Sequence, residues 1–288
     1  MKNDLCSLNV VEEQDFDLLA GYKIDTDNKT VRFAKPAGVV VALVPSTNPV
    51  ATIYFKALAT LMTRNSVILC PHPAAKECST HAADYLAGVA VKMGAPENAV
   101  QVVREPSIPF VNALMHSDDT SVILATGGPA MVRAAYSSGN PAIGVGPGNV
   151  PCYVDSSADV AKAGAEIVFS KSFDNSLPCA CESVVLADEE ISNNLKQSMI
   201  DAGAQFVAAE DIEKLSDFLF SDGQLNPAAL GRSAQTIAES AAITYQEGAK
   251  ILVVELDEIS ATNPYNKEKM CPVVGFHKVD GVEGGVEA

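Results

Sequence analysis

Two cysteines stand close together in a polar segment, and a cysteine thiolate is one of the nucleophiles that enzymes use. Cys179 and Cys181 lie in the proline-containing segment Phe173–Ser183, directly before a predicted strand at Val184–Ala187. A thiol in such a loop can be partly exposed and can act as a nucleophile once its thiolate is favoured. Three alternatives stay open, namely a metal site with further ligands, a redox pair with poor disulfide geometry, and small buried side chains.

A glycine-containing turn is the second candidate for chemistry. The segment Thr126–Pro129 follows a predicted strand and opens a helix with proline in its first turn. Its backbone amides and the helix dipole would suit a phosphate or a nucleotide, although an ordinary tight turn has the same pattern. The run Gly144–Asn149 lacks the last glycine of the G-x-G-x-x-G pattern and leads into a strand. It therefore does not predict the usual dinucleotide fingerprint.

A repeating pattern of strand, turn and helix must position these candidates in the first half of the chain. Strands that alternate with helices predict right-handed crossovers and a mostly parallel sheet. Ligands of such sheets bind at the carboxyl ends of the strands, where His72 lies between two prolines as a candidate ligand contact. The predicted strands are Val39–Val44, Ser66–Leu69, Val100–Val103 and Ser121–Ala125, and the segments at their ends are Pro45–Asn48, Cys70–Pro73 and Thr126–Pro129.

The helix after the second strand is expected to bury one stripe of side chains and to end at Gly94. The stripe would consist of Ala75, Cys78, Ala82, Tyr85 and Val89.

A dense glycine and proline stretch between Gly139 and Pro151 marks the expected domain junction. The sequence therefore predicts a first domain over residues 1–149 and a second over residues 150–288. The second half is again α/β. Its predicted elements are Cys152–Val154, Ala158–Ser170, Val184–Ala187, a helix from Ile191, Ser233–Ala241 and Ile251–Val254.

Composition excludes several classes of function. The net charge of -16 argues against a nucleic-acid surface or an anionic membrane as partner. No stretch of about 18 apolar residues is present to span a bilayer, and the acidic start of the chain does not resemble a secretory signal. Seven cysteines without a regular framework are typical of thiols in a reducing compartment, so we expect a cytoplasmic protein. Aromatic residues make up only 6% and tryptophan is absent, which argues against carbohydrate clefts and base-stacking surfaces and favours a small-molecule enzyme.

Four segments follow one another along the chain and read PAGVVVALVPSTNPVATIYFKAL, TRNSVILCPHPAAK, ILATGGPAMVRAAYSSGNPAIGVGPGNVP and SKSFDNSLPCACESVV. In this order they resemble the coenzyme-A-acylating branch of the aldehyde dehydrogenase superfamily. The resemblance is closest to the aldehyde dehydrogenase half of bifunctional aldehyde-alcohol dehydrogenases and to acylating sulfoacetaldehyde-type enzymes. It covers roughly Ala34 to Phe276 and implies an α/β, aldehyde dehydrogenase-like fold with a parallel, Rossmann-type nucleotide domain.

The resemblance also implies a role for individual residues. Cys179 matches the family's nucleophile, and Asn48 matches the asparagine whose amide, with a backbone N–H, forms the oxyanion hole. Val145 occupies the position where hydrolytic aldehyde dehydrogenases keep a glutamate, and valine cannot activate water. The segments that match walls of the nicotinamide nucleotide site comprise Ser46, Thr47, Pro71, His72, Pro73, Thr126, Gly127 and Gly128.

The implied function is NAD-dependent oxidation of a short aldehyde, with acetaldehyde first, to an acyl-CoA through a cysteine thioester. Coenzyme A is the expected co-substrate, with no metal, nucleic acid or membrane as partner. Family members extend beyond both ends of the resemblance, so both domains are expected to be incomplete and the full-length protein to be a homo-oligomer. The alternatives are a hydrolytic aldehyde dehydrogenase and a non-catalytic nucleotide-binding fragment.

Overall fold

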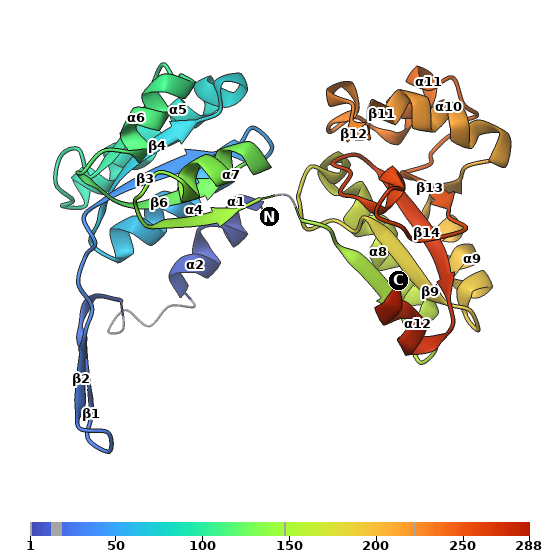
Figure 1. Cartoon of the computed structure of the whole chain (residues 1–288), viewed down its shortest axis with the longest axis horizontal. Coiled ribbons are helices and arrows are strands. Elements are labelled where there is room, and N and C mark those ends of the chain that lie inside the picture. The colour runs from blue at the N-terminus through green and yellow to red at the C-terminus, as the bar shows by residue number, and fades with distance from the viewer. Residues whose placement is uncertain (1, 13–18, 147, 222) are drawn as a thin grey trace. The chain divides into compact units, whose positions relative to one another are not determined.

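The chain folds into two compact units, Met1–Pro147 and Gly148–Ala288 (Figure 1). The structure is a computed structural model that describes residues 2–12, 19–146, 148–221 and 223–288. Pro147, part of the expected junction, lies outside the described residues.

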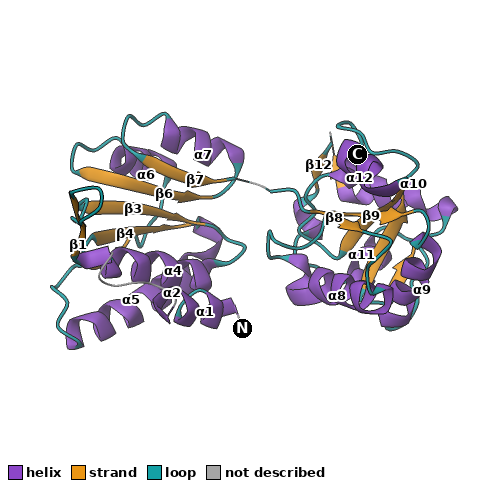
Figure 2. Cartoon of the chain, turned by 90° about the horizontal axis from the view of Figure 1, so that it is seen from below, coloured by secondary structure: helices purple, strands orange, loops and turns teal. Residues whose placement is uncertain are grey.

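The first unit is built on a five-stranded parallel sheet with the order β5-β4-β3-β6-β7. Helices cover both faces of this sheet, with α6 and α7 on one face and α4 and α5 on the other (Figure 2). Both faces of the central strand are therefore buried, which explains its unbroken aliphatic sequence. The strands are β3 (Val39–Val44), β4 (Ser66–Pro71), β5 (Val100–Val102), β6 (Thr120–Thr126) and β7 (Ala142–Val145), and the helices are α4 (Pro49–Met62), α5 (Lys76–Lys92), α6 (Ile108–Met115) and α7 (Pro129–Tyr136), with a 3₁₀ turn η1 (Pro73–Ala75).

The strand order creates a switch point in the first unit. From β3 the chain builds outward on one side through β4 and β5, and then on the other side through β6 and β7. Connections that leave on opposite faces open a crevice between the carboxyl ends of β3 and β6, where ligands of doubly wound sheets bind. The predicted parallel α/β class is confirmed. Strand β7 was not predicted, because its residues fall within the segment expected to be the domain junction.

The predicted stripe on α5 is wrong in its register. Of its members only Ala82 is buried, whereas Tyr85 is 66% and Val89 42% exposed. The buried side chains of α5 are instead Ser79, Ala82 and Ala83, all of them small. Small side chains let α5 approach the sheet closely, and the large aromatic side chain faces solvent. The predicted end of this helix is confirmed, since Gly94 takes a left-handed conformation with φ of 99°.

Two further parts of the first unit precede the sheet. The short helices α1 (Lys2–Leu5) and α2 (Leu8–Glu12) pack on α4. Strands β1 (Tyr22–Asp25) and β2 (Thr30–Phe33) form an antiparallel hairpin that extends away from the sheet (Figure 1). One face of this hairpin is apolar and exposed, with Tyr22 beside Phe33 and Ile24 opposite Val31.

The second unit has its own five-stranded parallel sheet, with the order β10-β13-β14-β9-β8. Helices α8 and α9 pack on one another and on this sheet, and α10 and α11 form a second core with β13 and β14. The main elements are β8 (Pro151–Val154), α8 (Val160–Ser172), β9 (Val184–Asp188), α9 (Ser192–Ala202), β10 (Ala204–Phe206), α10 (Ala209–Leu219), α11 (Ala234–Ser240), β13 (Ile251–Glu255) and β14 (Val273–Val279). The smaller ones are η2 (Phe173–Ser176), β11 (Phe220–Ser221), β12 (Gln224–Leu225), η3 (Pro227–Ala229), η4 (Pro264–Asn266) and α12 (Gly281–Glu287).

Within the described residues, no helix combines the length and the apolar character that crossing a membrane requires.

Candidate functional site

The carboxyl edge of the first sheet carries the candidate nucleotide-binding residues. Ser46–Asn48 follow β3, His72 follows β4, and Thr126 ends β6. Backbone hydrogen bonds tie neighbouring loops together, since His72 N donates to Val44 O at 2.9 Å and Gly127 N donates to Val145 O at 3.3 Å. The topology therefore brings all the predicted segments of this unit to one edge. Their exposure differs, with Ser46, Pro73 and Val145 exposed, Thr47 half-buried and Pro71 buried.

Lys56 lies beneath this edge and was not singled out from the sequence. It projects from α4 and is only 2% exposed. Its Nζ donates to Leu43 O at 2.6 Å and to Leu124 O at 2.7 Å, so one ammonium joins the two strands that part at the switch point. A lysine within the apolar face of a predicted helix was the signal that could have identified it.

Burial lowers the pKa of Lys56 to about 7, and the neighbouring Cys70 opposes this shift. Between about pH 7 and the ordinary lysine pKa of 10.5, the unfolded chain binds a proton that the folded chain does not. The free energy of unfolding should therefore rise with pH in this window, by about 2 kcal/mol between pH 7 and pH 9. Urea unfolding at both pH values should show this gain in the wild type and not in Lys56→Met. An equal pH dependence in the two proteins would contradict the assignment.

Asn48 occupies the N-cap of α4, yet its side chain does not cap the helix. Instead its Oδ1 accepts a hydrogen bond of 2.7 Å from Lys2 Nζ. Because Oδ1 accepts this bond, a ligand can contact the amide through Nδ2, which donates hydrogen bonds. The side chain is thus suited to polarise an oxygen that gains negative charge.

Gly127 and Gly128 lie in the turn that joins β6 to α7. Neither has a positive φ, and Gly128, at the N-cap of α7, has a φ of -67°. A Cβ on Gly128 would meet no atom of the chain within 4 Å, and one on Gly127 would make only ordinary contact with Met131. The fold itself does not require glycine at either place. A ligand that lies against the backbone amides would require it.

His72 has a local structural role in addition to its exposed position. Its Nδ1 accepts a hydrogen bond of 3.2 Å from Ala74 N and so caps the 3₁₀ turn η1. A ligand could therefore contact only the remaining edge of the imidazole ring.

The cysteine loop lies in the second unit, at the amino end of its strand β9. Three successive residues before the cysteines, Asp174, Asn175 and Ser176, have φ values of 50°, 51° and 60°. Left-handed backbone costs a non-glycine residue roughly 1–2 kcal/mol, and Asp and Asn tolerate it best, so Ser176 is the residue at which the loop before Cys179 is most strained. Such strain is typical of segments that hold a reactive group in a fixed place.

The two cysteines of this loop have opposite environments. Cys179 is exposed, whereas Cys181 is 8% exposed and its Sγ lies 3.3 Å from Ser170 O, to which it donates. Burial raises the pKa of Cys181, although Ser176 and Lys171 oppose the shift. Cys181 therefore remains a protonated, structural thiol, and Cys179 is the sulfur that an external molecule can reach.

Two buried lysines support the cysteine loop, and sequence reasoning missed both. Lys171, at the end of α8, donates to Lys269 O at 3.1 Å. Lys269 in turn donates to the backbone oxygens of Ser183 at 2.9 Å, Lys267 at 2.9 Å and Tyr265 at 2.5 Å. Desolvation lowers the pKa of both lysines. These bonds join the end of α8, the start of β9 and the segment before β14.

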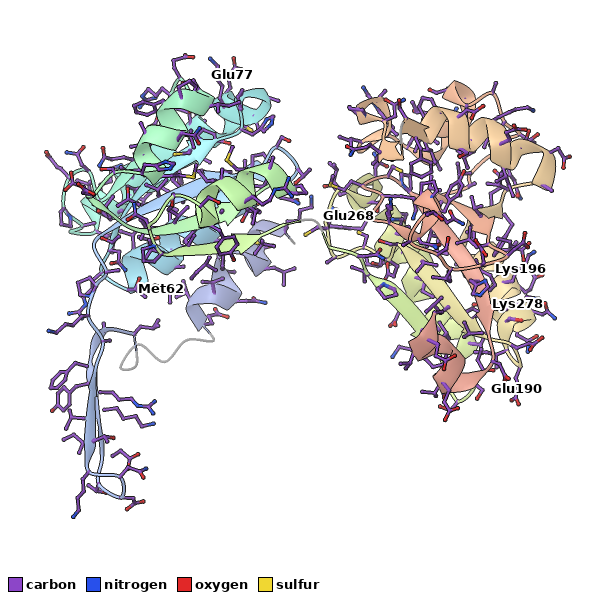
Figure 3. All side chains as sticks on the ribbon, in the orientation of Figure 1. Met62, Glu77, Glu190, Lys196, Glu268 and Lys278 are labelled. Atoms are coloured by element: carbon purple, nitrogen blue, oxygen red, sulfur yellow. The ribbon has the colours of Figure 1, made fainter. Side chains whose placement is uncertain are left out.

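Carboxylates lie beside these lysines. Glu268, labelled in Figure 3, has a pKa raised by burial, while Lys171 and the Gly148 backbone oppose the shift. Glu182 directly follows Cys181, and its Oε2 is buried without a hydrogen-bond partner among the described residues. The surroundings of the loop therefore hold charged groups of both signs.

The metal alternative finds no support in the described parts of the chain. No group of three or more His, Cys, Asp or Glu side chains there could hold a metal ion. All seven cysteines are free thiols.

Comparison with known proteins identifies relatives along most of the chain. The sequence model of the aldehyde dehydrogenase family matches residues 11–273 of this chain. A bifunctional aldehyde-alcohol dehydrogenase, AdhE, from Escherichia coli K12 is 39% identical over 258 residues, which cover 90% of this chain and 29% of the relative. The chain thus spans less than a third of that relative's length.

Solved structures agree with this match. An acetylating aldehyde dehydrogenase from Geobacillus thermoglucosidasius superimposes with a TM-score of 0.93 at 38% identity, over 99% of this chain and 63% of that one. A propionaldehyde dehydrogenase from Rhodopseudomonas palustris, solved with bound CoA and an acylated cysteine, has a TM-score of 0.83 at 32% identity and covers 89% of this chain and 58% of its own.

Proposed function

The chain belongs to the aldehyde dehydrogenase family, and from this we propose that it catalyses NAD-dependent, CoA-acylating oxidation of a short aldehyde, with acetaldehyde first. The observation that carries the proposal is the exposed thiol of Cys179 on a strained loop, next to a buried Cys181. The relative from Rhodopseudomonas palustris, with CoA and an acylated cysteine, supports the same chemistry.

The reaction follows from the properties of these residues. The Cys179 thiolate adds to the aldehyde carbonyl, and we assign to the Asn48 amide and the Cys179 backbone N–H the stabilisation of the oxyanion. Bound NAD supplies the hydride acceptor. Loss of hydride leaves an acyl group on Cys179 as a thioester. The thiolate of coenzyme A then attacks this thioester, the S–C bond to Cys179 breaks, and acyl-CoA leaves.

Val145 favours the acylating reaction over hydrolysis. Its side chain is 57% exposed at the end of β7 and cannot take a proton from water. The thioester therefore persists until a thiol arrives. NADH production that depends on CoA, measured with short aldehydes, tests the proposal, and NAD binding without turnover of any aldehyde would favour the non-catalytic alternative.

A glutamate at position 145 should restore hydrolysis in part. Val145→Glu places a carboxylate at an exposed position, where it can remain charged without a burial cost and can act as a general base. We expect NADH production without CoA to rise about tenfold or more over the wild type. Val145→Gln introduces a side chain of the same size as glutamate but without a carboxylate to act as a base, and it should show no such rise. If the two variants behave alike, Val145 is not what prevents hydrolysis.

Gly128→Ala should separate nucleotide binding from stability. The added methyl group meets no atom of the chain, but alanine is a poorer N-cap than glycine and this offsets the entropy gain, so the free energy of unfolding should change by less than about 1 kcal/mol. The affinity for NAD should fall about tenfold, because the methyl group stands against a bound phosphate. Gly88→Ala on α5, which also meets no atom within 4 Å, is the control and should leave NAD affinity unchanged. Unchanged NAD affinity in Gly128→Ala would contradict the placement of the nucleotide.

Two further expectations remain part of the proposal. The exposed apolar face of the β1–β2 hairpin supports a homo-oligomer, since a large unpartnered apolar surface is typical of an interface. The free state of all seven cysteines supports a reducing, cytoplasmic location.

A further inference from the structure

The second strand of the first unit ends without the charge that usually selects a dinucleotide. In doubly wound sheets the adenosine ribose lies beside this strand end, where a carboxylate binds a 2′-hydroxyl and a basic side chain accepts a 2′-phosphate. Here the segment Pro71–Ala75 contains no acidic residue, arginine or lysine. The first charged side chain after β4 is Lys76, at the start of α5. Lys76 and its partner are therefore the first charged groups to consider for discrimination by charge.

Lys76 is paired with an acid from the neighbouring strand end. Its Nζ lies 2.8 Å from Glu105 Oε2 and 3.1 Å from Glu105 Oε1. Glu105 follows β5, and because β4 and β5 are adjacent and parallel, their carboxyl ends lie side by side. The hydrogen bond and charge of Glu105 raise the pKa of Lys76, so the ammonium stays charged. The Glu105 side chain is 85% exposed and open to an incoming ligand.

The remaining charges around this pair do not favour an anion. Arg104 is held by Asp84 through two hydrogen bonds of 2.9 Å and 3.0 Å. Glu77, labelled in Figure 3, follows Lys76 and contributes a further negative charge that acts on it. Three carboxylates thus surround two cations. A 2′-phosphate would meet a net negative region whose nearest ammonium is already engaged.

We infer that the Lys76–Glu105 pair determines dinucleotide specificity and makes the chain select NAD against NADP. Glu105 keeps Lys76 from a 2′-phosphate and repels that phosphate, whereas a 2′-hydroxyl carries no charge and tolerates both groups. The inference rests on the proposed nucleotide site at this edge of the sheet, and it adds the residues that set the choice of cofactor.

Direct binding of NAD and NADP by titration calorimetry tests this inference without any need for turnover. The wild type should bind NAD more tightly. Glu105→Gln removes the repulsion and releases Lys76, so the affinity for NADP relative to NAD should rise about tenfold. The double variant Glu105→Gln with Lys76→Gln should lose this gain. Glu97→Gln makes the same charge change near the amino end of β5, at the other edge of the sheet, and should leave the ratio at the wild-type value.

Each other outcome overturns the inference. A wild type that prefers NADP, a Glu105→Gln ratio equal to that of Glu97→Gln, or a double variant that keeps the gain contradicts the role of the pair. Absence of binding of either dinucleotide contradicts the nucleotide site as well. A missing CoA-dependent activity would instead contradict the proposed reaction and would leave the measured binding ratio valid as a test.

Discussion

Cys179→Ala should abolish CoA-dependent NADH production, with a loss of about 10³-fold or more. The reason is chemical, because without the sulfur no thioester forms and the hydride has no covalent adduct to leave from. Fold and stability should change little, since Cys179 is exposed and its side chain packs in no core. The measurement is the rate of NADH formation with a short aldehyde and CoA in the variant and in the wild type. The circular dichroism spectrum of the variant checks that it is folded.

Cys181→Ala is the matched control for this prediction. It removes a buried thiol that donates to Ser170 O, so a modest loss of stability is expected. The rate per folded molecule should stay within a few-fold of the wild type. Equal losses of activity in the two variants would contradict a single nucleophile at Cys179.

Lys269→Ala should unfold or strongly destabilise the second unit. The lysine side chain is 2% exposed and donates to three backbone oxygens, and the substitution leaves the oxygens of Tyr265 and Lys267 without this donor, whereas Ser183 O still accepts from Gly275 N. Each unsatisfied buried group costs roughly 1–3 kcal/mol, so the loss should reach about 4 kcal/mol or more. Urea unfolding followed by circular dichroism measures this loss.

Two variants make the Lys269 prediction specific. Lys269→Met keeps most of the side-chain volume but no donor, so a large loss in this variant assigns the effect to the hydrogen bonds. Lys250→Ala removes an exposed ammonium that donates to Ala202 O at 3.0 Å, and its loss should be much smaller. A Lys269→Met protein as stable as the wild type would contradict the account.

Hydrophobic runs and turn residues were enough to predict the elements that carry the site. The strand Val39–Val44 could be predicted because helices cover both its faces, so that every residue is apolar. The edge strand β7 was missed because its sequence lies within a glycine and proline run, and an edge strand needs fewer apolar residues. The stripe on α5 was misplaced because close packing selected the small side chains Ser79 and Ala83 rather than Tyr85.

The sequence does not show which groups the supporting lysines of the site bind. A lysine is ordinarily a surface residue, and only the three-dimensional arrangement shows that Lys56, Lys171 and Lys269 each bind backbone oxygens in the interior. The most distant partners of these three lysines lie 68, 98 and 86 residues away along the chain, respectively. The difference between Cys179 and Cys181 also depends on burial, which their spacing does not reveal.

Trapping the intermediate tests the central claim most directly. The chain is incubated with a short aldehyde and NAD in the absence of CoA, and its peptides are analysed by mass spectrometry. We predict one acyl group on Cys179 and none on Cys181, and release of that group as acyl-CoA when CoA is added. Release of the free acid without CoA, or acylation at a residue other than Cys179, would contradict the account.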